Sequence, residues 1–170
     1  MYRFGDIALM HPLWSDVQLH LPRVWRTVRA YERDRSAQED LVQEILLAVW
    51  QGLPRLRDPA RLPAYMLRIA HNLGASHVRQ AVRSTDRSPL DQEAMESIAD
   101  ASSDPGEVDT QWLLDALRLI PLPQRQVLLL QLEGFDYKEI AEMLGISTDN
   151  VGVRAHRARK ALQEIHDGHQ

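Results

Sequence analysis

Two short helical segments joined by a tight turn, in residues 135–162, constrain the fold of this chain more than any other stretch. Asp136 followed by Glu139 forms a capping box at the start of the first segment. Gly145 stands where the turn needs a left-handed backbone, and Ser147 is placed to cap the second segment. Small and apolar residues recur at helical spacing on the side where the two segments would cross. The pattern predicts a helix-turn-helix.

The second of these helices is basic on its outward side. Residues 151–160 hold three arginines, one lysine and no acidic residue. On a helical wheel the inward positions are Val151, Ala155, Ala158 and Leu162. We expect the rest of this helix to contact phosphates and major-groove base edges through Thr148, Asn150, Val153, Arg154, His156, Arg157 and Lys160. The alternative is a solvated face on an ordinary helix pair.

The net charge of −4 suits a DNA-binding protein only when it is divided along the chain. Residues 1–83 hold 12 arginines and 8 acidic residues, whereas residues 84–110 hold one arginine and 8 acidic residues. Residues 111–170 hold 7 basic and 8 acidic residues, and their positive charge is concentrated on the last helix. The acidity therefore lies mainly in the middle of the chain, and both ends can meet nucleic acid.

The composition excludes several classes of site. The chain has no cysteine, and its seven histidines show no paired-ligand spacing, so we expect no disulfide, no metal and no cofactor. No phosphate loop or nucleophile elbow occurs, so we expect a protein that is not an enzyme. The longest apolar runs are too short to span a bilayer, and no signal peptide is indicated. We therefore expect a cytoplasmic protein without membrane insertion.

Helical periodicity dominates both ends of the chain, and strand signals are nearly absent. In the first half we expect three or four helices, among them helices over about residues 15–31, 37–51 and 63–83, with an arginine- and proline-rich loop at residues 53–62. Ser15 is expected to cap the first helix, and Ser36 with Glu39 to form a capping box for the second. Pro63 suits the first turn of the third.

The middle of the chain has the composition of a linker. Residues 84–110 are rich in Ser, Asp, Pro and Gly and contain no aromatic residue, with one brief helix conceivable at residues 91–99. Helices over residues 112–119 and 123–133 are expected before the helix-turn-helix. The sequence thus predicts an all-α fold of two small helical domains, residues 1–83 and 111–170, joined by a flexible acidic linker.

Three blocks, in this order, resemble the extracytoplasmic-function (ECF) sigma factors of bacterial RNA polymerase. Residues 39–50, EDLVQEILLAVW, are similar to the polymerase-binding helix of the family's region 2. Residues 64–80, AYMLRIAHNLGASHVRQ, are similar to its promoter-melting and minus-10 helix, and residues 119–162 resemble region 4, which reads the minus-35 element. The resemblance implies a transcription initiation factor that binds core RNA polymerase, directs it to promoters and helps to melt the DNA.

The chain departs from the family pattern within the minus-10 helix. The family usually has Trp where Tyr65 stands and Asp where Ser76 stands, and often a second Arg where Gln80 stands. Tyr65 keeps an aromatic surface, so stacking on a base survives. The missing acid at Ser76 removes a local hydrogen-bond partner and bears on which promoter bases are preferred.

A polar stripe on the predicted third helix suits single-stranded DNA, because cations follow the backbone while flipped bases stack or form hydrogen bonds. By resemblance, minus-10 recognition and melting fall to Tyr65, Arg68, His71, Asn72, Ser76, Arg79 and Arg83. The loop at residues 53–62 lies next to this helix and would complete a pocket for a flipped base. The alternative is an amphipathic core helix with ordinary surface arginines.

The predicted helix over residues 37–51 has a core stripe of Leu41, Val42, Ile45 and Val49. By resemblance, its opposite face docks on the basic clamp helices of the polymerase β′ subunit through Asp40, Gln43, Glu44 and Leu47. From spacing alone, a solvated charged face is the alternative.

The partners implied by the resemblance are core RNA polymerase (β′ clamp helices and β flap), promoter DNA and an anti-sigma factor. The acidic linker would thread towards the RNA path of the polymerase, or serve as a solubilising tether. Two other functions stay open: a stand-alone helix-turn-helix regulator, and a sigma-mimicking protein that sequesters an anti-sigma factor. The all-helical first half argues against the regulator, and the arginines of the last helix argue against the mimic.

Overall fold

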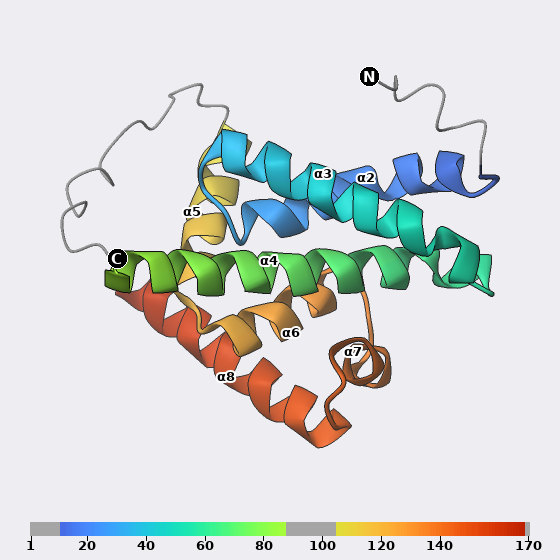
Figure 1. Cartoon of the computed structure of the whole chain (residues 1–170). Coiled ribbons are helices and arrows are strands. Elements are labelled where there is room, and N and C mark those ends of the chain that lie inside the picture. Colours follow the sequence, from blue (N-terminus) through green and yellow to red (C-terminus); the bar gives the residue numbers. More distant parts are fainter. Residues whose placement is uncertain (1–10, 88–104, 169–170) are drawn as a thin grey trace.

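A computed structural model describes residues 11–87 and 105–168, and every regular element in those two ranges is helical. The first range contains α2 (Trp14–Arg29), α3 (Arg35–Gly52), the 3-10 turns η1 (Leu53–Arg55) and η2 (Pro59–Arg61), and α4 (Leu62–Arg87). The second contains α5 (Pro105–Leu119), α6 (Leu122–Leu132), α7 (Tyr137–Leu144) and α8 (Thr148–Asp167). The long helix α4 crosses the middle of the molecule, with α2 and α3 on one side and α6, α7 and α8 on the other (Figure 1). The predicted all-α fold is confirmed.

The helices of the first half share one apolar core. Val24 of α2, Ile45 of α3 and Met66 of α4 are each fully buried in it. The core stripe predicted for α3 is buried along its whole length, at Leu41, Val42, Ile45 and Val49. Burial of that stripe leaves the opposite side of α3 facing outward.

The N-termini of α2 and α3 differ from the sequence prediction. Asp34, not Ser36, caps α3: its Oδ1 accepts a hydrogen bond from the Ala37 backbone N–H at 2.8 Å. Asp34 is an equally good capping residue and lies two positions earlier in an extended conformation. The helix therefore begins before Ser36. Ser15 likewise lies inside α2 and donates to the Pro12 carbonyl at 3.5 Å instead of capping the helix.

Both helices that border the predicted linker reach into it. α4 continues past Arg83, where Ser84 and Thr85 return hydrogen bonds to the carbonyls one turn earlier at 2.9 and 3.0 Å. α5 begins at Pro105, a residue suited to the first turn of a helix. The brief helix expected at residues 91–99 and the flexibility expected of the linker fall outside the described residues.

The two halves of the chain pack against each other through apolar cores that both halves build. Leu67 of α4 is buried together with Val127 and Leu130 of α6. A second shared cluster joins Tyr31, just after α2, to Leu117 of α5. The helix α4 is consequently buried on two sides, by α2 and α3 and by the second half.

A half-buried acidic residue fastens the two halves together. Glu133, just after α6, accepts hydrogen bonds from Arg23 Nε at 2.6 Å and Arg26 Nε at 3.0 Å, and its side chain is only 11% exposed. Burial raises the pKa of the Glu133 carboxyl, but the hydrogen bonds from Arg26 and Arg23 outweigh burial and leave that pKa below its usual value. We call this trio, Glu133 with Arg23 and Arg26, the Glu133 clamp.

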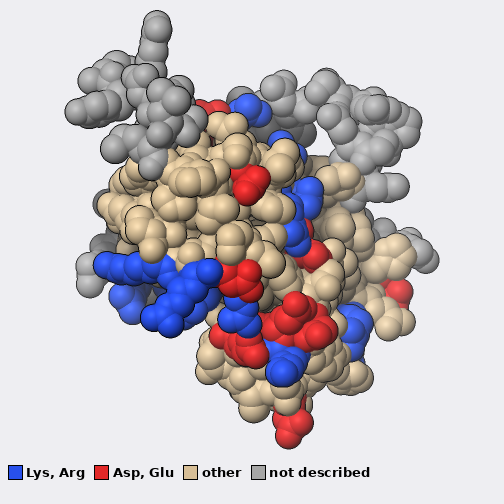
Figure 2. Space-filling view, turned by 90° about the vertical axis from the view of Figure 1, so that its right-hand side faces the viewer, with Lys and Arg blue, Asp and Glu red and all other residues tan. Residues whose placement is uncertain are grey.

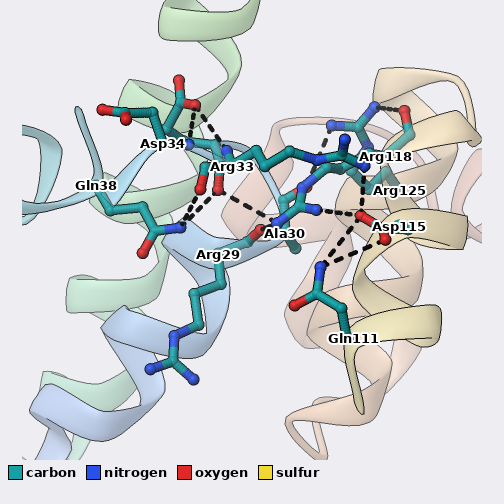
Figure 3. A network of polar contacts seen from close by, with 10 residues as sticks. Arg29, Ala30, Arg33, Asp34, Gln38, Gln111, Asp115, Arg118 and Arg125 are labelled. Carbon is teal, nitrogen blue, oxygen red and sulfur yellow. Dashed lines mark hydrogen bonds and ion pairs between the residues drawn. The ribbon is translucent and has the colours of Figure 1, made fainter. Parts of the chain in front are cut away.

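Arginines of the second half also bind the carbonyl oxygens at the end of α2 (Figure 3). Arg118 donates to the Arg29 carbonyl at 2.6 Å, and Arg125 donates to the Ala30 carbonyl at 3.3 Å. Cations here both satisfy the last carbonyls of the helix and complement its dipole. The buried Arg125 thus links the two halves through backbone groups that α2 leaves without helical partners.

Candidate nucleic-acid interface

The helix-turn-helix has the predicted local structure. Asp136 and Glu139 form the complete capping box, each side chain accepting from the other's backbone N–H at 2.8 Å. Gly145 has a φ of 66°, the left-handed conformation that the turn requires. Ser147 caps α8 through the Asn150 N–H at 3.2 Å. These caps fix the direction in which α8 leaves the turn.

The helices α7 and α8 cross at the positions where small and apolar residues were predicted to meet. Ile140 and Ala141 of α7 are buried against Val151 and Ala155 of α8. Ala158 is buried as well, whereas Leu162 is half-buried. The inward face of α8 is therefore confirmed, and its opposite side is left to solvent.

All seven residues predicted to contact minus-35 DNA lie on the outer side of α8 or at its start. Six are exposed and one, Arg154, is half-buried; together they are the reader face: Thr148, Asn150, Val153, Arg154, His156, Arg157 and Lys160. Arg154 Nε donates to Asn150 Oδ1 at 2.9 Å, so this guanidinium is held in place before any DNA arrives. Val153 is 48% exposed and adds an apolar surface of the kind that contacts a thymine methyl group.

Two residues beside the reader face were not predicted. Arg159 of α8 is exposed and donates to the Tyr137 hydroxyl at 3.4 Å, which ties the basic helix to the start of α7. A Cβ at position 152 would lie 3.6 Å from Cε2 of the same tyrosine ring, so the Gly152 backbone passes close to it. The sequence signal was present, since Arg159 is one of the three arginines of this helix. The predicted set of contact residues nevertheless did not include it.

The predicted minus-10 and melting residues of α4 do not all share one surface. Arg68, Asn72, Ser76, Arg79 and Arg83 are exposed and Tyr65 is half-buried; these six are the melting face. His71 was expected among them, and that expectation is wrong: its side chain is 0% exposed. His71 Nδ1 is 2.7 Å from the Tyr31 hydroxyl, and burial lowers the pKa of His71 to about 3, so its ring is neutral.

The burial of His71 follows from the position of α4 in the fold. Leu67, His71 and Gly74 stand at helical spacing on a second buried side of this helix. The Gln126 side chain of α6 donates to the His71 carbonyl at 3.4 Å, which shows how close the second half lies. A helical wheel assumes one buried face, and α4 has two.

The arginine-rich loop does lie beside the melting face. Arg55 of η1, together with Arg57 and Arg61, is exposed close to the start of α4. Burial raises the pKa of the Tyr65 hydroxyl, and the charges of Arg55 and Arg68 oppose that rise, so both cations lie near the ring. Figure 2 shows Lys and Arg side chains gathered on this end of the molecule. An aromatic ring flanked by cations is a suitable platform for an unpaired base.

The predicted polymerase-binding residues form one exposed surface on α3. Asp40, Gln43 and Glu44 are exposed, and Leu47 is 56% exposed beside them. We call these four residues the docking face. It combines acidic and amide groups with a single apolar side chain, the composition that a basic protein surface with an apolar contact point would complement.

The two described ranges contain neither a metal-binding cluster nor a membrane-spanning helix. No group of three or more His, Asp or Glu side chains there is placed to hold a metal ion. No helix there is long and apolar enough to cross a membrane.

The helix-turn-helix has a basic second helix and packs against the first half of the chain, where α4 carries its own row of arginines. This arrangement defines a helical DNA-binding protein with two candidate DNA surfaces. Residues 17–84 match the family Sigma-70 region 2, and residues 110–162 match Sigma-70, region 4. The chain therefore belongs to the sigma-70 family of transcription initiation factors, and its curated relatives place it among the extracytoplasmic-function members.

Individual relatives agree with this assignment. The ECF RNA polymerase sigma factor ShbA of Streptomyces griseus is 33% identical over 95% of this chain and 89% of its own length. The probable RNA polymerase sigma factor RfaY of Xanthomonas campestris is 33% identical over 79% of this chain. The match spans only 35% of the length of RfaY. The sigma factor RpoE of Bartonella quintana, solved in complex with the anti-sigma factor NepR, superposes with a TM-score of 0.74 at 27% identity. That match covers 90% of this chain and 95% of the RpoE chain.

Proposed function

We propose that this chain binds core RNA polymerase through the docking face, contacts the minus-35 element with the reader face and opens the minus-10 element with the melting face. One observation carries the proposal: the fold presents two separate cationic, hydrogen-bonding surfaces, on α8 and on α4, and an acidic surface on α3. A DNA-binding regulator needs only the first of these surfaces. Promoter opening by a polymerase-bound factor uses all three.

The reader face suits duplex DNA. Exposed arginines and a lysine can neutralise phosphates, while the guanidinium of Arg154, held by Asn150, keeps its remaining N–H groups for base edges. The melting face suits single strands, because Tyr65 supplies a stacking surface and Arg68 and Arg79 supply charge along the backbone. His71 has no part in this proposal, since it is buried.

Further partners follow from the family. The region 4 half would also contact the β flap of the polymerase, and an anti-sigma factor would bind this chain as NepR binds the RpoE relative. We place the protein in the cytoplasm, where polymerase and promoters are found.

Purification with core polymerase, followed by transcription from a cognate promoter, tests the proposal. The Glu44→Lys substitution would put a positive charge opposite the basic docking site and should reduce holoenzyme assembly sharply, because like charges across an interface repel. The fold should be unaffected, since Glu44 is exposed. Asp16→Lys makes the same charge change at an exposed position of α2 and serves as the matched control. Normal assembly of the Glu44→Lys variant would show that the docking face is elsewhere.

A further inference from the structure

The hydroxyl end of the Tyr65 side chain lies against Gly52, the last residue of α3. A Cβ atom at position 52 would overlap the Tyr65 hydroxyl oxygen and would lie 2.9 Å from Cζ of the ring. Real Cβ atoms do not approach other atoms so closely. The phenol therefore fills the space that any other residue at position 52 would need for its side chain.

The backbone gives no separate reason for a glycine at this position. Gly52 has φ −97° and ψ −16°, values that residues with side chains adopt readily. It also ends a helix, where alanine would be the better helix former. Position 52 thus accommodates the close approach of Tyr65 because glycine has no Cβ.

The tyrosine whose hydroxyl reaches Gly52 belongs to the melting face. Tyr65 packs against the apolar core of the first half and stays partly exposed. Arg55 and Arg68 lie near its hydroxyl. The orientation of an aromatic ring decides whether a base can stack on it, because stacking needs the two planes offset and nearly parallel.

We propose that Gly52 is a positioning residue for promoter melting. Because Gly52 has no side chain, the Tyr65 hydroxyl can lie against the backbone at the end of α3. This contact fixes the Tyr65 ring at the angle at which it receives an unpaired base. This inference rests on the melting role proposed for Tyr65. It adds a residue of α3, outside the melting face, that acts through the ring without touching DNA.

A side chain at position 52 would displace the end of the Tyr65 side chain. The atoms in its way are the far end of a flexible side chain, so the Gly52→Ala variant keeps its fold and Tyr65 turns aside. Removing only the hydroxyl, by Tyr65→Phe, deletes the overlapping oxygen and leaves Cζ, which has to move by only a few tenths of an ångström. A phenylalanine ring stacks on a base as well as a tyrosine ring does.

The experiment follows strand opening by holoenzymes made with full-length variants, using fluorescence of 2-aminopurine at the first unpaired minus-10 bases. Tyr65→Ala sets the size of the stacking contribution, expected at roughly 5- to 100-fold in the opening equilibrium. Gly52→Ala should reproduce much of that loss on duplex DNA and little of it on a pre-melted bubble. Tyr65→Phe should open normally, and the double variant Gly52→Ala/Tyr65→Phe should recover most of the opening that Gly52→Ala loses. Gln51→Ala, an exposed neighbour at the same helix end, should behave as the unaltered protein.

Rescue by Tyr65→Phe is the decisive result, because a general defect at the end of α3 would not be repaired by removing one oxygen from Tyr65. If Tyr65→Ala lowers opening while Gly52→Ala does not, Gly52 has no positioning role, although the proposed function stands. If Gly52→Ala loses equally on duplex and bubble, or is not rescued, position 52 serves folding alone. If Tyr65→Ala itself opens normally, both the melting role of Tyr65 and the inference that rests on it are overturned.

Discussion

At the scale of single residues, the cationic side chains of the reader face differ in whether another residue of the protein holds them in place. Arg154 is fixed by Asn150, and Lys160 Nζ lies 3.7 Å from Glu164 Oε1. Arg157 is exposed and forms no hydrogen bond or ion pair with any other residue in the described ranges. An unheld guanidinium can adopt the bidentate geometry that a guanine edge requires, whereas a lysine acts as a point charge.

Arg157 and Lys160 should therefore fail in different ways when replaced. Arg157→Ala should cost about 1–3 kcal/mol if it pairs with a guanine, and should relax preference at one minus-35 position. Lys160→Ala should weaken all sequences about equally and reduce the salt slope of binding by about one. Anisotropy titrations of holoenzyme with single-base variants of the minus-35 duplex, at several salt concentrations, separate the two. Glu164→Ala, which frees Lys160 without removing a cation, should not weaken binding.

The buried His71 makes stability depend on pH. Its folded pKa of about 3 lies below the usual value of 6.5, so the unfolded chain binds a proton that the folded chain does not. Stability contributed by the neutral ring is complete above about pH 6.5 and is lost as pH falls towards 3. Between pH 7 and pH 5, where carboxylates with lowered pKa values remain charged, the free energy of unfolding should drop by about 2 kcal/mol through this residue.

Urea unfolding of the full chain at both pH values measures that drop. His71→Gln cannot titrate and can still bond the Tyr31 hydroxyl, so its stability should change less between the two pH values. A variant that keeps the whole pH dependence would show that other groups are responsible.

Among elements, α4 presents the proposed melting face on one side and packs against the rest of the protein on two others. Replacing Asn72 and Arg79 together with alanine should leave binding to minus-35 duplex nearly intact, because both side chains are exposed and neither belongs to the reader face. Strand opening, followed by permanganate reactivity of unpaired thymines, should fall, since the contacts that offset unpairing are lost. A pre-melted bubble should restore much of the activity. Equal losses on duplex and bubble would assign both residues to packing.

Sequence patterns suffice for features that depend on neighbouring residues. The capping box of α7, the left-handed Gly145, the Ser147 cap and the core stripe of α3 all depend on residues within one or two turns, and the sequence predicted each of them. Local hydrogen bonds and helical spacing determine these features. The exposed positions of the docking face and the reader face follow from the same spacing.

Features that depend on contacts distant in sequence were missed. The second buried side of α4 exists because α6 lies against it, and nothing near His71 in the sequence signals that neighbour. The Glu133 clamp joins residues more than 100 positions apart. Asp34 was overlooked for a different reason, since two good capping residues stand close together and the pattern does not choose between them.

Over the whole molecule, the two halves are held together by both packing and charge. Glu133→Gln keeps the shape of the clamp but removes its charge, and hydrogen bonds to charged groups contribute about 1.5–3 kcal/mol each. We expect this variant to weaken the packed arrangement of the halves.

Because the chain has no cysteine, Ser36→Cys and Gln163→Cys introduce unique labelling positions on α3 and α8. Energy transfer between dyes there should fall in the Glu133→Gln variant, and added salt should have a smaller effect on it than on the unaltered clamp.

Glu39→Gln is the matched control for that experiment. It removes the charge from an exposed pair, Arg35 with Glu39, that lies within α3 alone. Energy transfer should not change in it. If the Glu133→Gln variant also leaves energy transfer unchanged, the shared apolar cores alone hold the halves together.

The core shared by α4 and α6 has a calorimetric consequence. Any partner that separates the halves exposes Leu67, Val127 and Leu130 to water. Hydration of apolar surface raises the heat capacity by roughly 0.45 cal/K/mol per Å². If association with polymerase separates the halves, it combines a negative heat-capacity change, from the surface buried at the docking face, with a positive one from the core exposed to water. The measured change should be less negative than the docked area alone implies, and the difference reports how much of that core the polymerase leaves uncovered.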